Sequence, residues 1–326
     1  MGATIKSIGI YHPEKAVFNS YFESYLDTSD QWIKERTGIE RRFHLSEKEF
    51  TSDMCVKAAQ NLSDNYNRDL TEIDFIIVAT TTPDQFIPSV ASQVQSRLKI
   101  PNAGTMDISA ACAGFVSGII LAKGLIAAKT HQKILVIGAD ALSKVTDFTD
   151  RNSCILFGDG AGAVMVEASE ENHLFDVITG TNGDYGKDLY VAYQDAPINN
   201  TDIVANGKLH QNGRMVYKWA VQTLTKGLNV LAEKNDITLE EIDYFAPHSA
   251  NYRMLEAIFN GLNIPMEKCL DSVRAYGNTS AASIPIAWYT GIKDGKLKLN
   301  HKLMLVGFGG GFNYSGIYLL NQIEMT

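Results

Sequence analysis

The chain turns from a strand-like segment into an apolar helix in the stretch Met106-Asp-Ile-Ser-Ala-Ala-Cys112-Ala-Gly-Phe-Val-Ser-Gly-Ile-Ile-Leu-Ala122. Cys112 stands at this turn, where the first N–H groups of a helix have no partner within it and the peptide dipoles add to about half a positive charge. We expect the position to stabilise a thiolate and to lower the pKa of Cys112 below the roughly 8.5 of a free cysteine. The alternative is a buried cysteine that packs as a small hydrophobic side chain.

Composition and charge place the chain among ordinary globular proteins. It has 326 residues, of which 45% are hydrophobic and 20% charged, enough for two domains or one large duplicated one. The formal net charge of −8 argues against general nucleic-acid binding. The start of the chain lacks a signal-peptide pattern, and the most apolar helix candidate, residues 113–129, is interrupted by serine, lysine and glycine. We therefore expect a protein without a membrane span.

Cysteine usage indicates a reducing compartment. The four cysteines lie far apart, with no pair at metal-ligand spacing and without the density of a disulfide framework. We expect a cytoplasmic protein with no metal site. The three cysteines other than Cys112 are interpreted as packing residues: Cys55, Cys154 and Cys269.

Two parts of the chain repeat the same order of elements. Predicted strands begin near Asp74 and Lys133 in the first part and near Asp243 and Lys302 in the second, and both pairs are 59 positions apart. This agreement indicates one ancestral α/β unit used twice. Short apolar strands that alternate with helices predict a mostly parallel, buried sheet in each half. The predicted halves are residues 1–172 and 173–326.

Three polar side chains fall at matching ends of the predicted strands, where open α/β sheets place their ligands. Cys112 opens the central helix of the first half, Asn278 lies at the corresponding turn of the second, and His248 ends the strand that matches residues 75–82. Taken singly, His248 is equally a structural histidine and Asn278 a turn residue beside a glycine. Their matched positions together favour one catalytic site at the junction of the halves.

Four motifs stand in order along the chain: Asp107-Ile-Ser-Ala-Ala-Cys-Ala-Gly-Phe115, Pro247-His-Ser-Ala-Asn-Tyr-Arg253, Tyr276-Gly-Asn-Thr-Ser-Ala-Ala-Ser283 and Gly307-Phe-Gly-Gly-Gly-Phe312. They resemble β-ketoacyl-acyl-carrier-protein synthase III, the initiating condensing enzyme of bacterial fatty-acid synthesis. The segment Gln211-Asn-Gly-Arg-Met-Val-Tyr-Lys-Trp219 is similar to the variant of Gram-positive bacilli. The resemblance implies a thiolase-type five-layered αβαβα fold made of two duplicated halves, and a homodimer.

The resemblance assigns the three side chains to a decarboxylative Claisen condensation. Cys112 would attack the thioester of a short acyl-CoA and carry the acyl group. Backbone N–H groups of Cys112 and Gly310 would hold the oxyanion. His248, donating from Nε2, and Asn278 would bind the carbonyl oxygen of malonyl-acyl-carrier protein as carbon dioxide leaves. The product is a β-ketoacyl-acyl-carrier protein, and the reaction needs no cofactor.

The resemblance also assigns residues that bind coenzyme A. Trp32 and Arg151 would surround the adenine, Arg36 would pair with the phosphates, and Asn251 would lie near the pantetheine arm. The assignment is physically sound, since indole and guanidinium planes stack on a base and arginine pairs with phosphate. For Trp32 the alternative is simple packing within its helix.

The acyl pocket is assigned to two apolar side chains. Ile87 corresponds to a family position that reaches across the dimer and bounds this pocket. Phe157 is a candidate gate over the nucleophile, with a core role as an equal alternative. The branched side chain at position 87 leaves the primer open between acetyl and branched short acyl groups. The polar segment 182–208 is interpreted as an irregular loop that could cover the site.

An acidic carrier protein requires a local basic surface on a net-negative enzyme. The candidates are Arg253, Lys218 and Arg214. Two other functions stay open at this point. One is a related condensing enzyme or acyltransferase of secondary metabolism with another acceptor, and the other is an idle acyl-CoA-binding protein. Dependence on the carrier protein, and turnover after acylation, would distinguish them.

Overall fold

The computed structural model describes residues 2–325 and is built around two mixed sheets. The first has the strand order β1-β7-β6-β4-β5 and the second the order β11-β12-β13-β8. In each sheet a long strand (β6 or β12) pairs parallel with one neighbour and antiparallel with the other, so the two sheets share one topology. The strands are β1 (Gly2–Tyr11), β4 (Phe75–Ala79), β5 (Gly104–Ile108), β6 (Lys133–Ala141), β7 (Asp159–Ser169), β8 (Leu174–Thr181), β11 (Tyr244–Pro247), β12 (Lys302–Gly309) and β13 (Asn313–Leu320).

The prediction of mostly parallel sheets is wrong. In the first sheet β4 runs parallel to β5 and β6, but β7 is antiparallel to both β6 and β1. In the second, only β11 and β12 are parallel. The connection between β12 and β13 explains the difference, because it contains only the three residues Gly310–Phe312. A parallel pair needs a crossover of a dozen or more residues, so a link this short joins antiparallel neighbours.

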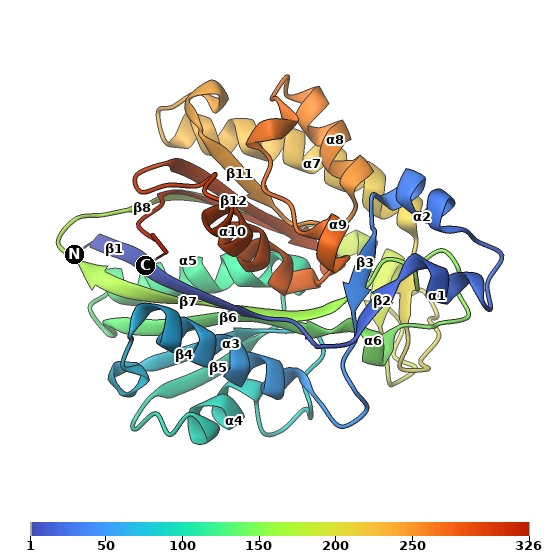
Figure 1. Cartoon of the computed structure of the whole chain (residues 1–326), viewed down its shortest axis with the longest axis horizontal. Helices are drawn as coiled ribbons and strands as arrows, with labels where there is room; N and C mark the ends of the chain where they lie inside the picture. Colours follow the sequence, from blue (N-terminus) through green and yellow to red (C-terminus); the bar gives the residue numbers. More distant parts are fainter. Residues whose placement is uncertain (1, 326) are drawn as a thin grey trace.

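Helices form three layers around the two sheets, which makes five layers in all (Figure 1). Helices α3 and α4 pack on the outer face of the first sheet, α7 and α8 cover the second, and α5 and α10 lie between the sheets. This arrangement confirms the predicted αβαβα fold of two halves. The layer helices are α3 (Thr51–Tyr66), α4 (Val90–Arg97), α5 (Gly114–Ala127), α7 (Gly213–Lys234), α8 (Tyr252–Gly261) and α10 (Ser283–Lys293).

Side-chain alternation along the strands supplies two of these layers at once. Successive side chains of a strand point to opposite faces of the sheet. In β4, Ile76 and Val78 therefore pack with the outer helices, whereas Ile77 packs with α5 and α10 in the middle layer. The middle cluster also contains Leu303 and Leu305 of β12, so both halves contribute to it.

An aspartate ties neighbouring strands together at the same place in each half. The side chain of Asp74 accepts hydrogen bonds from the backbone N–H groups of Gln132 and Lys133, and that of Asp243 accepts one from Lys302 at 2.7 Å. These bonds align the start of β4 with β6 and of β11 with β12. They give a physical reason for the repeated spacing of 59 positions.

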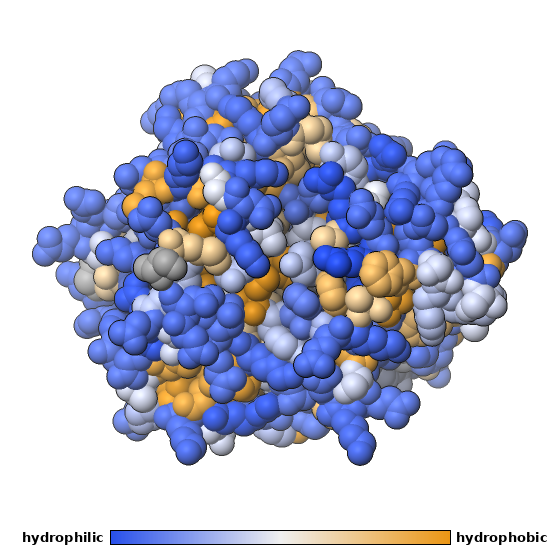
Figure 2. All heavy atoms as spheres, viewed as in Figure 1, coloured by the Kyte–Doolittle hydropathy of each residue, from blue (hydrophilic) through white to orange (hydrophobic). Residues whose placement is uncertain are grey.

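The remaining elements are short and lie beside the sheets. They are β2 (Ala16–Phe18), β3 (Arg41–Phe43), β9 (Leu189–Val191), β10 (Leu209–Gln211), α1 (Asn19–Glu23), α2 (Asp30–Thr37), α6 (Leu142–Val145) and α9 (Val273–Tyr276). The predicted boundary after residue 172 lies in the connection between β7 of the first sheet and β8 of the second. Within residues 2–325, no helix has the length and apolar character needed to cross a bilayer. Figure 2 shows a mostly hydrophilic face with separate apolar patches.

Candidate active site

Cys112 lies in a short 3-10 turn (Ala111–Ala113) between β5 and α5, as predicted. Ala111 has a φ of 47°, a left-handed conformation, and this residue redirects the chain from strand to helix. Gly309 at the end of β12 approaches closely from the other half. A Cβ at that position would lie 2.8 Å from the Cys112 nitrogen and 3.0 Å from its sulfur, so only glycine fits beside the nucleophile.

The pKa prediction for Cys112 is wrong. Burial raises the pKa of this thiol to about 12, and the nearby Asp140 carboxylate acts in the same direction. The Ser280 hydroxyl opposes the shift by donating a hydrogen bond to the sulfur over 3.3 Å. The helix start therefore does not suffice to give a thiolate in the free protein, because the desolvation of the sulfur is the larger effect.

His248 follows β11 directly and is 2% exposed. Its Nδ1 lies 2.7 Å from the hydroxyl of Ser283, and its ring meets Phe308 edge-on at 5.0 Å. Burial lowers the pKa of His248 to about 3, with the Ser280 backbone opposing the shift. The imidazole is therefore neutral at physiological pH. A neutral imidazole can donate a hydrogen bond from one ring nitrogen without acting as an acid.

Asn278 is held by its own backbone and by one side-chain bond. Its N–H donates to the Leu156 carbonyl at 2.8 Å, and its carbonyl accepts from Gly158 at 3.0 Å. Its Oδ1 accepts from the Ser280 N–H at 2.9 Å. Because Oδ1 is occupied, the orientation of the amide is set, and Nδ2 makes no hydrogen bond within residues 2–325. This NH₂ group is available as a donor to a ligand.

One cavity of about 650 Å³ brings the three side chains together. Cys112, His248 and Asn278 all line it, although they come from different turns of the two halves. The glycine loop after β12 closes one side. Other predicted site residues in its wall are Gly310, Phe157, Trp32, Arg36 and Asn251.

The residues predicted to bind coenzyme A lie close to one another, and three of them line this cavity. Trp32 and Arg36 of α2 line it, and the guanidinium of Arg151 lies 5.1 Å from the centroid of the Trp32 ring. Asn251 caps α8 and donates from Nδ2 to the Arg36 carbonyl at 3.2 Å, which joins α8 to α2. A stacking plane and two guanidinium groups thus lie side by side at the wall of the cavity.

The two residues assigned to the acyl pocket, Phe157 and Ile87, differ in their position relative to the cavity. Phe157 lies in the wall, is 4% exposed and forms a parallel bridge to Asn278, so its backbone supports the amide. Ile87 does not line the cavity of its own chain and is 88% exposed. The single chain therefore does not bring Ile87 to the site.

The predicted carrier-protein residues lie on α7 and α8, next in sequence to residues that line the cavity. Arg214 and Lys218 are exposed and form no ion pair within residues 2–325. Arg253 instead pairs with Glu256 at 2.8 Å and donates to the Glu35 carbonyl. The unpaired positive charge of this surface therefore comes from α7.

Sequence reasoning missed several residues of the cavity. The segment 182–208 contains β9, which pairs with β10, and Leu189, Val191 and Leu209 of this hairpin line the cavity. Ser280 and Ser283 were also missed as partners of Cys112 and His248. Both are in the motif that contains Asn278, but serines are common at helix starts, and their partners are distant in the sequence.

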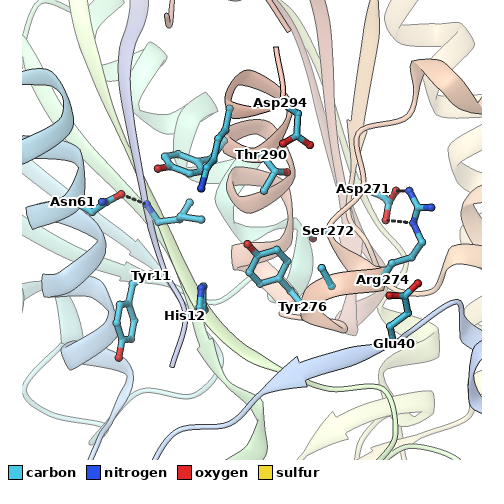
Figure 3. A pocket seen from close by; sticks show the side chains of 14 residues that line it. Tyr11, His12, Glu40, Asn61, Asp271, Ser272, Arg274, Tyr276, Thr290 and Asp294 are labelled. Atoms are coloured by element: carbon cyan, nitrogen blue, oxygen red, sulfur yellow. Dashed lines mark hydrogen bonds and ion pairs between the residues drawn. The ribbon is translucent and has the colours of Figure 1, made fainter. Parts of the chain in front are cut away.

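A second cavity of about 620 Å³ lies on another part of the molecule, between α3, α9 and α10 (Figure 3). Its polar groups are mostly satisfied within the chain: Arg274 pairs with Asp271 at 3.0 Å, and Asn61 accepts from the Ile10 N–H. None of its lining residues is shared with the first cavity. The nucleophile, imidazole and amide thus identify the first cavity as the candidate active site.

The fold and this cavity together define a condensing enzyme of the thiolase type. The models of 3-oxoacyl-[acyl-carrier-protein] synthase III match residues 106–183, and those of its C-terminal part match residues 232–320. A β-ketoacyl-[acyl-carrier-protein] synthase III 2 of Halalkalibacterium halodurans is 47% identical over 97% of this chain and 96% of its own length. The one of Bacillus subtilis is 46% identical over 97% and 98%.

Solved structures agree with these relatives. The β-ketoacyl-[acyl-carrier-protein] synthase III of Thermus thermophilus superposes with a TM-score of 0.93 at 38% identity, and 98% of each chain is covered. A priming β-ketosynthase of the R1128 polyketide pathway superposes at 0.92 with 28% identity, over 99% of this chain and 97% of that one. The chain belongs to the β-ketoacyl-acyl-carrier-protein synthase III family.

Proposed function

We propose that this protein condenses a short acyl-CoA primer with malonyl-acyl-carrier protein and so initiates fatty-acid synthesis. The observation that supports this proposal is the meeting of a thiol and two neutral donors in one cavity. The thiol is Cys112, and the donors are His248 and the Nδ2 group of Asn278. Identity of 47% to a β-ketoacyl-acyl-carrier-protein synthase over nearly the whole chain favours the carrier substrate over other acceptors.

In the first half-reaction, the Cys112 sulfur attacks the thioester carbonyl of the acyl-CoA. A new S–C bond forms, the bond to the CoA sulfur breaks, and the thiol proton passes to the departing CoA thiolate. Backbone N–H groups of Cys112, in the 3-10 turn, and of Gly310, in the glycine loop, would hold the oxyanion. Trp32, Arg36 and Arg151 hold the nucleotide part of CoA.

In the second half-reaction, the malonyl thioester loses carbon dioxide. The electrons of the broken C–C bond form an enolate, whose oxygen accepts hydrogen bonds from His248 and Asn278. Neutral donors suit this step because they stabilise the negative oxygen without protonating the carbon nucleophile. The carbanion then attacks acyl-Cys112, and the released thiolate takes up a proton.

Mass spectrometry of the protein mixed with acetyl-CoA or isobutyryl-CoA tests the first step. We expect one acyl group on the Cys112 peptide, none in Cys112→Ser, and an acylated but non-condensing Asn278→Ala. An unmodified Cys112 peptide in active enzyme would overturn the proposal. Comparing the two primers at saturation also decides between acetyl and branched groups.

The carrier protein is proposed to dock on α7 at the cavity mouth. Lys218→Glu reverses one of the unpaired charges, so we expect KM for malonyl-acyl-carrier protein to rise about three- to tenfold. Acylation by acyl-CoA should stay unchanged. Lys293→Glu, beside the second cavity, is the matched control. Equal effects of Lys218→Glu on both substrates would refute this docking surface.

A homodimer is proposed because β5 is an unpaired edge of the first sheet. Exposed edges invite pairing with another chain, and exposed apolar patches mark interfaces. The loop after β4 adds Phe86, 82% exposed, and Ile87 next to it. In the dimer Ile87 would reach the acyl pocket of the partner subunit. Sedimentation equilibrium is expected to give twice the chain mass, and a monomer with full activity would contradict this.

The free cysteines suit a cytoplasmic location.

A further inference from the structure

The hydroxyl of Ser283 lies beside one of the two nitrogens of the His248 ring, Nδ1. Ser283 is the first residue of α10, is fully buried, and its Oγ lies 2.7 Å from His248 Nδ1. The same Oγ receives the backbone N–H of Ser249 at 3.3 Å. Within residues 2–325 these are its two hydrogen-bond partners.

The hydrogen bonds of the Ser283 hydroxyl determine which nitrogen of the His248 ring carries the hydrogen. A serine hydroxyl has one hydrogen and two lone pairs. The Ser249 N–H uses one lone pair, which leaves the hydroxyl hydrogen for Nδ1. If Nδ1 carried its own hydrogen, Ser283 would accept twice, and its O–H would be buried with no acceptor. Satisfying the buried Ser283 hydroxyl therefore requires an unprotonated Nδ1 and, in the neutral ring, a hydrogen on Nε2.

The first half of the chain offers an internal comparison. Residues 169 positions earlier than His248 and Ser283 are Ala79 and Gly114. These also face each other, because a Cβ at Gly114 would lie 2.8 Å from the Ala79 Cβ. The same pair of positions is thus in contact in both halves. One half has both the imidazole and the hydroxyl, and the other has neither.

We propose that Ser283 is a positioning residue that fixes His248 as the Nε2–H tautomer, so that the ring presents a donor and not a lone pair to the malonyl thioester. The catalytic consequence rests on the proposed function above. The tautomer itself does not, because it follows from contacts within the free protein.

The direct test is the ¹⁵N spectrum of histidine-labelled wild-type protein near pH 7, without substrate. Signals of His248 are assigned by their absence in His248→Gln. We expect a protonated Nε2 and an unprotonated Nδ1 in the wild type, and a growing share of the Nδ1–H form in Ser283→Ala. A protonated Nδ1 in the wild type would overturn the inference.

The catalytic test uses Ser283→Ala and separates the two half-reactions. Condensation of pre-acylated enzyme with malonyl-acyl-carrier protein should fall roughly tenfold, while acylation of Cys112 by acyl-CoA should keep its rate. Ser7→Ala, which removes another buried hydroxyl without a partner, is the control. Unchanged condensation in Ser283→Ala, or an equal loss in both steps, would refute the role. Failure of the wild type to acylate would instead overturn the proposed function and leave the tautomer result standing.

Discussion

The turn around Cys112 (Ala111–Ala113) and the turn around Ala281 (Ser280–Ala282) occupy matching places in the two halves. They also have the same backbone conformation. They lie 169 positions apart, and each is a 3-10 turn followed at once by a middle-layer helix, α5 or α10. Each begins with a left-handed residue, Ala111 with φ 47° or Ser280 with φ 50°. The local chain geometry is therefore not peculiar to the turn that bears the thiol.

The two turns differ in the residue that faces the N–H group of their middle residue, Cys112 or Ala281. The Ala281 N–H donates to the buried Asp140 carboxylate at 3.3 Å. The residue that matches Asp140 in the second half is Gly309, which has no side chain to cap the Cys112 N–H. The Asp140 carboxylate occupies the anion position at the Ala281 turn, and under the proposed function the same position at the Cys112 turn would take the oxyanion of the substrate. The two turns thus differ in one facing residue, which is an aspartate at the Ala281 turn and a glycine at the Cys112 turn.

Gly309→Ala is expected to break this comparison most strongly. Its Cβ would lie within 3.0 Å of the Cys112 nitrogen, Cβ and sulfur, so the oxyanion position is blocked. We expect acylation to fall more than about a hundredfold, as for the loss of an oxyanion donor. Stopped-flow mass spectrometry of acyl-Cys112 measures it. Gly124→Ala, at an open position of α5, should acylate normally. A near-normal rate in Gly309→Ala would show that this approach is unimportant.

Asp140→Asn tests the other turn. One carboxylate oxygen accepts from the Thr81 N–H at 2.7 Å and the other accepts from the Ala281 N–H. The amide of asparagine has a single oxygen, so it can replace only one of these two acceptors. We expect the free energy of unfolding in urea to fall by about 1–3 kcal/mol. The exposed Asp294→Asn should change it by less than about 0.5 kcal/mol. If both variants are equally stable, Asp140 does not hold the Ala281 turn.

The pH dependence of Cys112 alkylation tests how burial and the helix start affect the thiol. Both turns lie at the start of a helix, but only the Cys112 turn bears a thiol that can report its pKa. With its pKa raised to about 12 by burial, the thiol is mostly protonated between pH 6 and 9. The thiolate fraction then rises about tenfold per pH unit, and the rate with iodoacetamide should rise with it. Since burial lowers the pKa of His248 to about 3, its ring adds no step in this range. A rate that levels off above pH 7 would contradict the high pKa.

Ser280→Ala has the smallest expected effect and tests contact between the two turns. The Ser280 hydroxyl donates to the Cys112 sulfur and stabilises the thiolate. Losing one such bond is worth about 0.5–1 kcal/mol, so alkylation should slow about two- to fivefold. The rate at fixed pH, compared with that of Ser7→Ala, measures it. An unchanged rate would mean that the 3.3 Å contact contributes nothing to the reactivity of the sulfur.

Much of this arrangement could be predicted from the chain alone. The repeated spacing of 59 positions indicated two units, and strand ends in matching places put Cys112, His248 and Asn278 in one site. Those signals depend only on residue type and spacing, which the sequence contains. The pKa of Cys112 could not be predicted in the same way, because it depends on the balance between a helix start and the packing of β12 from the other half. The roles of Ser280 and Ser283 also depend on partners more than 30 positions away.

The middle layer carries a consequence for the history of the chain. Helices α5 and α10 share one apolar cluster with strands of both sheets, so each unit covers a surface that the other would expose to water. If the two units descend from one, that ancestor required a second copy of itself to be stable, and joining the copies in one polypeptide made the pairing permanent.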